Sequence, residues 1–221
     1  DDVAATFTNF AMSGIDKVHF GLEAAVSIPI YHTLALNGAV SWGQYTYDSN
    51  PYYLQTQDNS GDIVSDGYVY WKDFRVESTP QTAVNVGLSW RSNNNIYLSA
   101  DFNYYNNMYL SMSPIYRTDA VITGGMAPGD IEHLRRQEKF DSAYTLNASI
   151  GKNWYIHRKY TLGFSLDVKN ILNNQDIKTG GYEQTRLSKN TETTVTTYQA
   201  FDSKYFYMFG TTYYLNLYFR F

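Results

Sequence analysis

The sequence contains no cysteine, so it can form neither a disulfide framework nor a thiolate metal site. It also lacks long hydrophobic runs, and no window approaches the roughly 18 apolar residues that a membrane-spanning helix needs. Lysine and arginine total 17 against 21 acidic residues, without a dense basic cluster, so we expect no nucleic-acid partner. The first six residues are neither basic nor apolar enough to begin a signal peptide. These absences argue against a helical membrane protein, a disulfide-stapled domain and a nucleic-acid-binding protein.

Aromatic residues, in contrast, are abundant. They make up 17% of the chain, and 22 of them are tyrosines. Tyrosine and tryptophan suit a boundary at which the ring is apolar and the hydroxyl or N–H group stays in water. The low mean hydropathy of -0.42 is compatible with membrane-spanning β-strands, because alternating residues average to a polar value.

The end of the chain alternates between two kinds of side chain. Large side chains occupy every second position, namely Tyr213, Leu215, Leu217, Phe219 and Phe221, and the residues between them are small, polar or amphipathic. A period of two is typical of a strand with one apolar and one polar face. We interpret this segment as the closing strand of a membrane β-barrel.

The same alternation recurs in six earlier segments, so the fold class is all-β and the expected architecture is a transmembrane antiparallel barrel. The bulky side chains of Trp42, Trp90, Phe102 and Phe164 fall on the apolar faces, where we expect them to anchor the barrel in lipid. We expect a loop over residues 1–17. The seven expected strands lie near residues 18–30, 34–47, 81–91, 96–105, 142–153, 160–169 and 205–221.

The connections between these strands are alternately short and long. The long ones span about residues 48–79, 106–141 and 170–204, and residues 68–76 of the first contain enough aromatic and β-branched residues for an extra strand. Outer-membrane barrels have this asymmetry, with long loops outside the cell. Closed bacterial barrels have an even number of strands, so seven strands indicate the C-terminal part of a larger barrel, with Asp1 in an outer loop.

Several motifs carry a resemblance to a known family. The segment Val168-Lys-Asn-Ile-Leu-Asn-Asn-Gln175 resembles the motif after the penultimate strand of TonB-dependent outer-membrane receptors. Ser78-Thr-Pro80 resembles their entry into a strand, and residues 215–221 resemble their closing strand. Further segments are similar to the Bacteroidetes branch that carries an N-terminal carboxypeptidase-regulatory-like domain, namely residues 50–51, 116–119, 134–138 and 179–186.

The resemblance implies a barrel of roughly 22 strands around a plug domain, in the bacterial outer membrane. Residues 1–221 would form its C-terminal portion without the plug. Its implied function is the energy-coupled uptake of a nutrient. The implied partners are the N-terminal remainder of the barrel with its plug, the TonB complex through that remainder, lipid and lipopolysaccharide, and a surface lipoprotein or larger envelope complex.

Seven charged loop residues are the candidates for a functional site: Arg117, Asp119, Arg135, Arg136, Glu138, Glu183 and Arg186. They can form ion pairs that hold the outer loops together, or a rim that contacts substrate, because guanidinium groups bind carboxylates and phosphates well. The four histidines are far apart in the sequence, and no catalytic motif occurs. We therefore expect no enzymatic activity, no cofactor and no metal site.

Two alternatives to a transport receptor stay open. A receptor-like barrel can serve as a structural or assembly component of a larger outer-membrane or secretion complex. Alternating strands also build soluble β domains, including carbohydrate-binding ones, and such a domain would stay in solution without detergent.

Overall fold

The computed structural model describes residues 7–157, 159–189 and 196–221, and this part of the chain is all-β, as the alternation predicts. It contains twelve strands, one short 3-10 helix and two short α-helices. No helix in the described part is long and apolar enough to cross a membrane.

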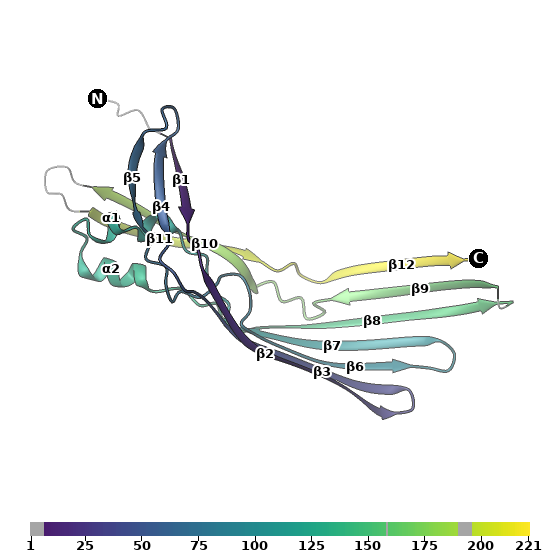
Figure 1. Ribbon diagram of the computed structural model, residues 1–221. Coiled ribbons are helices and arrows are strands. Elements are labelled where there is room, and N and C mark those ends of the chain that lie inside the picture. The colour runs from purple at the N-terminus through teal and green to yellow at the C-terminus, as the bar shows by residue number, and fades with distance from the viewer. Residues whose placement is uncertain (1–6, 158, 190–195) are drawn as a thin grey trace.

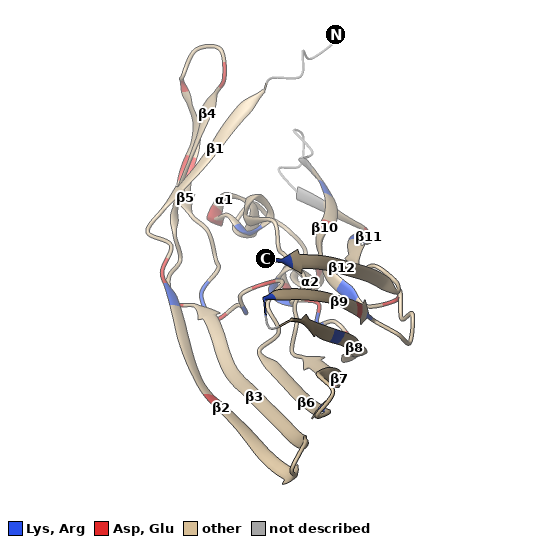
Figure 2. Ribbon diagram, turned by 90° about the vertical axis from the view of Figure 1, so that its right-hand side faces the viewer, with Lys and Arg blue, Asp and Glu red and all other residues tan. Residues whose placement is uncertain are grey.

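Seven long strands form one antiparallel sheet (Figure 1). Among the described residues, the outer strands of this sheet, β2 and β12, each have one unpaired edge, so the sheet is open. Its strands follow a curved arc, with few charged residues along their length (Figure 2). In spatial order they are β12 (Thr212–Arg220), β9 (Tyr160–Lys169), β8 (Ala143–Ile156), β7 (Ile96–Asn106), β6 (Thr82–Arg91), β3 (Leu34–Tyr47) and β2 (Lys17–Tyr31).

The register of the sheet keeps its two faces chemically separate. One row of directly paired residues runs Ile28, Leu36, Leu88, Ala100, Ala148, Val168 and Tyr213 across all seven strands. The next row along the strands, on the opposite face, includes Ser27, Asn37, Gly87, Asp101 and Asn147. Because a shift of one residue would exchange the two faces, the sequence pattern specifies this register strongly.

The expectation of a loop over residues 1–17 is wrong for β1 (Thr8–Ser13), which is a strand. Residues 1–6, including Asp1 with its expected place in an outer loop, lie outside the described ranges. Strand β1 pairs with β4 (Tyr52–Gln57), which pairs with β5 (Ile63–Tyr68), in a separate three-stranded sheet. The extra strand expected over residues 68–76 is also misplaced, since beyond Tyr68 this segment makes only isolated bridges. Phe10 stacks on Tyr53 with ring centroids 5.2 Å apart, which gives the short strand β1 an apolar contact.

The third long connection contains a hairpin of β10 (Lys178–Lys189) and β11 (Thr196–Tyr207). The closing strand therefore begins at Thr212, and residues 205–207 of the range expected for it belong to β11. Asn170 holds the break between them, because its side chain donates hydrogen bonds to the carbonyl oxygens of Asn174 at 2.9 Å and Phe209 at 3.1 Å. Its own carbonyl accepts a bond from the Thr211 hydroxyl at 2.8 Å.

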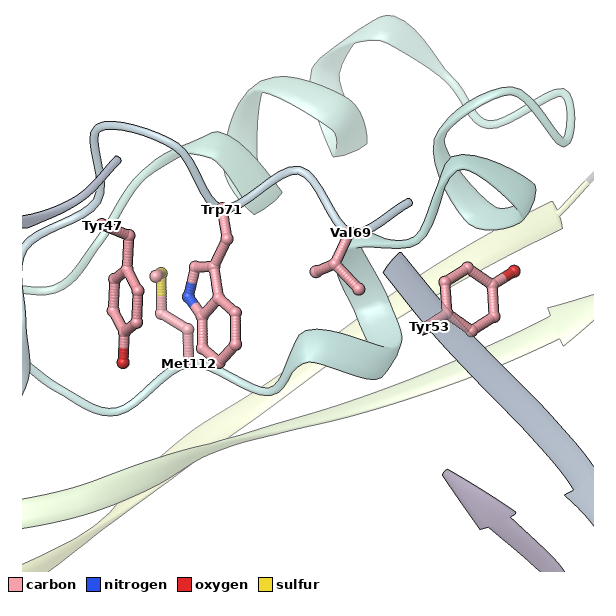
Figure 3. Close-up of a cluster of buried hydrophobic side chains, with 5 residues drawn as sticks. All are labelled: Tyr47, Tyr53, Val69, Trp71 and Met112. Carbon is pink, nitrogen blue, oxygen red and sulfur yellow. The ribbon is translucent and has the colours of Figure 1, made fainter. Parts of the chain in front are cut away.

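The hydrophobic core lies at the end of the molecule that carries the long connections. Its larger cluster contains Tyr47, Tyr53, Val69, Trp71 and Met112 (Figure 3). The Tyr47 and Trp71 rings stack with centroids 4.5 Å apart. A second cluster contains Met108, Leu110 and Phe140.

Candidate functional site

The three long connections meet at one end of the sheet, and we call this region the loop end. It comprises residues 48–79, residues 107–142 and the described part of residues 170–211. The second connection contributes a 3-10 helix (Pro114–Arg117), α1 (Asp119–Ile122) and α2 (Pro128–Arg135). All seven charged candidates lie in this region, on the side opposite the short turns (Figure 1).

Arg117 and Glu183 form an ion pair within the loop end. Arg117 is only 2% exposed, and its second terminal nitrogen lies 3.0 Å from the other oxygen of Glu183, so the pair is bidentate. The same guanidinium donates to the carbonyl oxygens of Leu134 at 2.9 Å and Ser113 at 3.0 Å. Arg117 therefore joins the 3-10 helix, the end of α2 and strand β10, which matches the ion-pair interpretation of these charges.

Asp119 also connects two segments. Its carboxylate accepts hydrogen bonds from the backbone N–H groups of Tyr68 at 3.1 Å and Ala120 at 2.7 Å. The hydroxyl of Thr118 accepts a bond from Val121 N–H at 3.3 Å and caps α1. These bonds fix α1 against the end of β5.

Glu138 contacts the β10–β11 hairpin. Its carboxylate accepts hydrogen bonds from the hydroxyls of Tyr205 at 2.7 Å and Ser203 at 3.2 Å, and Lys178 lies 3.5 Å away. Burial, and next the hydrogen bond to the Glu138 carboxylate, raise the pKa of Tyr205. The folded protein therefore favours the neutral form of the Tyr205 phenol.

The remaining three candidates are exposed. Arg136 pairs with Glu132 one helical turn away at 2.5 Å, and Arg186 lies over the Phe201 ring at 5.6 Å. The side chain of Arg135 makes no hydrogen bond or ion pair within the described ranges. Of the seven candidates, these three guanidinium groups are the ones placed to meet a molecule that arrives from solvent.

Two hollows lie on either side of the segment around α2. One, of about 420 Å³, includes Tyr70, Lys72, Arg117 and Arg135 in its wall. The other, of about 530 Å³, lies between the β10–β11 hairpin and residues 110–112 and 133–138, and we call it the hairpin hollow. Sequence reasoning missed its wall residues Tyr198, Phe201 and Asp202, although β-branched and aromatic residues in 195–207 were a signal for a strand there.

The residues expected to face lipid lie on the apolar face of the sheet. Trp42 is 45% exposed and Phe102 is 42% exposed, while Trp90 and Phe164 are half-buried among neighbours on the same face. The expected closing-strand residues are also exposed, and they are Tyr213, Leu215, Leu217, Phe219 and Phe221. No group of three or more potential metal-ligating side chains occurs in the part of the chain that the structure describes.

No family model, curated protein or solved structure matches the chain.

Proposed function

We propose that the chain forms seven neighbouring strands of the β-barrel of an energy-coupled outer-membrane receptor. The observation that carries this proposal is the continuous apolar face of the long sheet, which nothing in the described protein covers. The charged and hydrogen-bonded loop end then corresponds to the extracellular side.

The apolar face has the chemistry and the length of a lipid-facing surface. Leu22 is 68% exposed and Leu217 is 70% exposed, although they lie near opposite edges of the sheet. The strands contain 9 to 15 residues. A tilted strand of about 9–11 residues crosses the hydrocarbon core of a bilayer. In water, an exposed apolar surface of this extent would favour aggregation, whereas lipid satisfies it.

The opposite face suits a hydrated interior. Asn37 links Ser27 and Ser89 by hydrogen bonds of 2.7 and 3.1 Å. Asn85 donates to Asn103 at 2.8 Å on the same face. Membrane barrels place such polar side chains toward the lumen, where water or a plug domain contacts them.

The unpaired edges of β2 and β12 support a larger barrel. Unsatisfied backbone groups within hydrocarbon cost several kcal/mol each, so a lipid-embedded sheet needs strand partners at both edges. In this proposal the remainder of the barrel supplies those strands, together with the plug and its contact to the TonB complex. Substrate is captured at the loop end, and movement of the plug admits it.

Purification from bacterial membranes tests the proposal. The protein should fractionate with the outer membrane, require detergent for extraction and co-purify with a polypeptide segment that carries the plug. Mass and N-terminal sequence of every polypeptide in the particle identify that segment. Several envelope proteins in fixed ratio without a plug would support the assembly role instead. A stable monomer in the absence of detergent would overturn the membrane assignment.

A further inference from the structure

We propose that the free edge of β11 and the hairpin hollow together bind an extended polypeptide by β-strand addition. The inference names a ligand class for the loop end, and it rests on the proposed function only in placing that end outside the cell. Two observations support it: β11 has an unpaired backbone edge, and the hollow beside it contains polar side chains without a hydrogen-bond partner in the described structure.

The two edges of the β10–β11 hairpin differ. The outer edge of β10 lies against the preceding loop: the Tyr116 hydroxyl donates to the Thr185 carbonyl at 2.8 Å, and Ser111 forms a parallel bridge with Tyr182. Strand β11 has no strand partner other than β10 among the described residues. In Figure 2 it is the outer strand of the hairpin, and β10 lies between it and α1.

An unpaired strand edge presents a row of N–H and C=O groups, and an extended peptide backbone is the ligand that matches this row. Strand β11 is 12 residues long, and about half of its residues direct backbone groups away from β10. Proteins commonly protect an exposed edge with proline or several lysines. Residues 196–207 contain no proline and one lysine, Lys204. A bulge at Asp202 and Ser203, which both lie opposite Glu183, interrupts the strand, so its regular edge lies over residues 196–201 and 204–207.

The hairpin hollow offers a place for a side chain of the added strand. Its volume is about 530 Å³, and Tyr198, Phe201 and Tyr205 supply aromatic surface. Glu183 is already paired with Arg117, and Glu138 with Lys178. In the described structure, the side chains of Gln184 and Asp202 make no hydrogen bond or ion pair, so they are available to a ligand.

Backbone addition distinguishes a peptide from other ligands that could enter the hollow. A saccharide or a small aromatic compound can contact the rings and the two polar side chains. Neither presents amide groups at the spacing of about 3.3 Å per residue that a strand edge requires. Protection of the β11 amides from exchange is therefore specific to this binding mode.

The test uses the detergent-purified protein with all its co-purifying polypeptides, and a casein digest as the probe. Mass spectrometry identifies retained peptides, and one of them is then synthesised with its backbone intact and with N-methyl groups at alternate residues. We expect the unmodified peptide to bind and to slow hydrogen exchange within residues 198–206. Two N-methylated peptides are made, one methylated at the odd and one at the even residues, so that each blocks the N–H groups of one edge. We expect the peptide whose blocked edge faces β11 to lose at least tenfold in affinity.

Variants within β11 provide the matched control. Phe201→Ala, in the wall of the hollow, should weaken peptide binding about tenfold. Phe206→Ala removes a ring from the same strand that is 59% exposed and lies outside the hollow, and it should leave affinity unchanged. Circular dichroism and exchange in the free protein check that both variants keep the hairpin.

Three results would overturn the inference: no retained peptide, equal binding of both N-methylated peptides, or binding without slower exchange in β11. Binding of maltoheptaose that leaves β11 exchange unchanged, in place of peptide, would assign the hollow to saccharides. If the protein fractionates with the outer membrane but fails these tests, the peptide site is wrong and the proposed function stands. If a detergent-free monomer binds peptide by strand addition, the peptide site stands and the barrel assignment is wrong.

Discussion

The long sheet and the loop end differ in whether their large apolar side chains are exposed or buried. The loop end buries its large apolar side chains, including Val69, Trp71 and Leu134, between connections. The sheet exposes its own, from Leu22 on β2 to Leu217 on β12. Under the proposed function, the difference corresponds to two surroundings for one chain: water around the loop end, where burial of apolar area stabilises, and lipid around the sheet.

The largest expected effect comes from breaking the buried ion pair of the loop end. Arg117→Met leaves the Glu183 carboxylate without its partner, and we expect the loop end to lose about 3–5 kcal/mol, measured as local opening by hydrogen exchange. Exchange within the long sheet should change little. The double variant Arg117→Met/Glu183→Met should recover most of the loss, because no charge stays unpaired.

Arg136→Ala is the matched control for that experiment. Its pair with Glu132 is exposed and within one helical turn, so its removal should cost about 0.3–0.5 kcal/mol. Equal losses for Arg117→Met and Arg136→Ala would show that burial of Arg117 has no energetic role.

The core cluster gives an effect of similar size with a graded control. Trp71→Ala should destabilise the loop end by about 3–5 kcal/mol through the cavity it leaves. The Trp71 indole N–H is buried without a hydrogen-bond partner, so Trp71→Phe removes an unsatisfied group and should cost clearly less. Denaturant or thermal unfolding, followed by hydrogen exchange within the loop end, measures the loss of stability in both variants. If Trp71→Phe cost as much stability as Trp71→Ala, the indole N–H would have a stabilising role, contrary to this expectation.

The sheet should respond to charge rather than to cavities. Val86→Arg places a guanidinium in the middle of the apolar face and should cost about 2–4 kcal/mol of folding in lipid. The expected result is a lower fraction assembled in the outer membrane, measured by fractionation and by heat-dependent migration on gels. Asn85→Arg, one residue away on the polar face, should assemble nearly normally. Equal assembly of both variants would contradict the lipid-facing assignment.

The smallest effect concerns pH. Because the pKa of Tyr205 is raised in the folded protein, its contribution is fully present below about pH 10, the usual pKa of an unfolded tyrosine, and is lost as pH rises further. Hydrogen exchange at β11 should therefore accelerate above about pH 10 relative to an unstructured reference. Tyr205→Phe should reduce this acceleration, and an unchanged profile would exclude Tyr205 as its source.

The long sheet was accessible from sequence because its information is local. A period of two along each segment, as in Leu215, Leu217 and Phe219, states which face is apolar, and neighbouring strands then align by that face. The seven strands of the sheet overlap the seven expected ranges, with the largest difference at the start of β12.

The loop end was less accessible because its contacts are distant in sequence. Strand β1 is six residues long and pairs with residues of β4 that lie 39 to 49 positions later, so its short alternation around Phe10 and Met12 resembles a loop. Charge alone placed Arg117 and Arg136 in one group, although one is buried in a pair 66 residues apart and the other is exposed. The partner of a charged residue depends on tertiary packing, which no local pattern contains.

Asn170 also gives the molecule a mechanical property. Between the last residue of β11 and the first of β12 only four residues intervene, and Asn170 holds this short segment through Phe209 and Thr211. Because these contacts act in parallel with the chain, a force applied to the hairpin is shared between Asn170 and the segment that leads into β12.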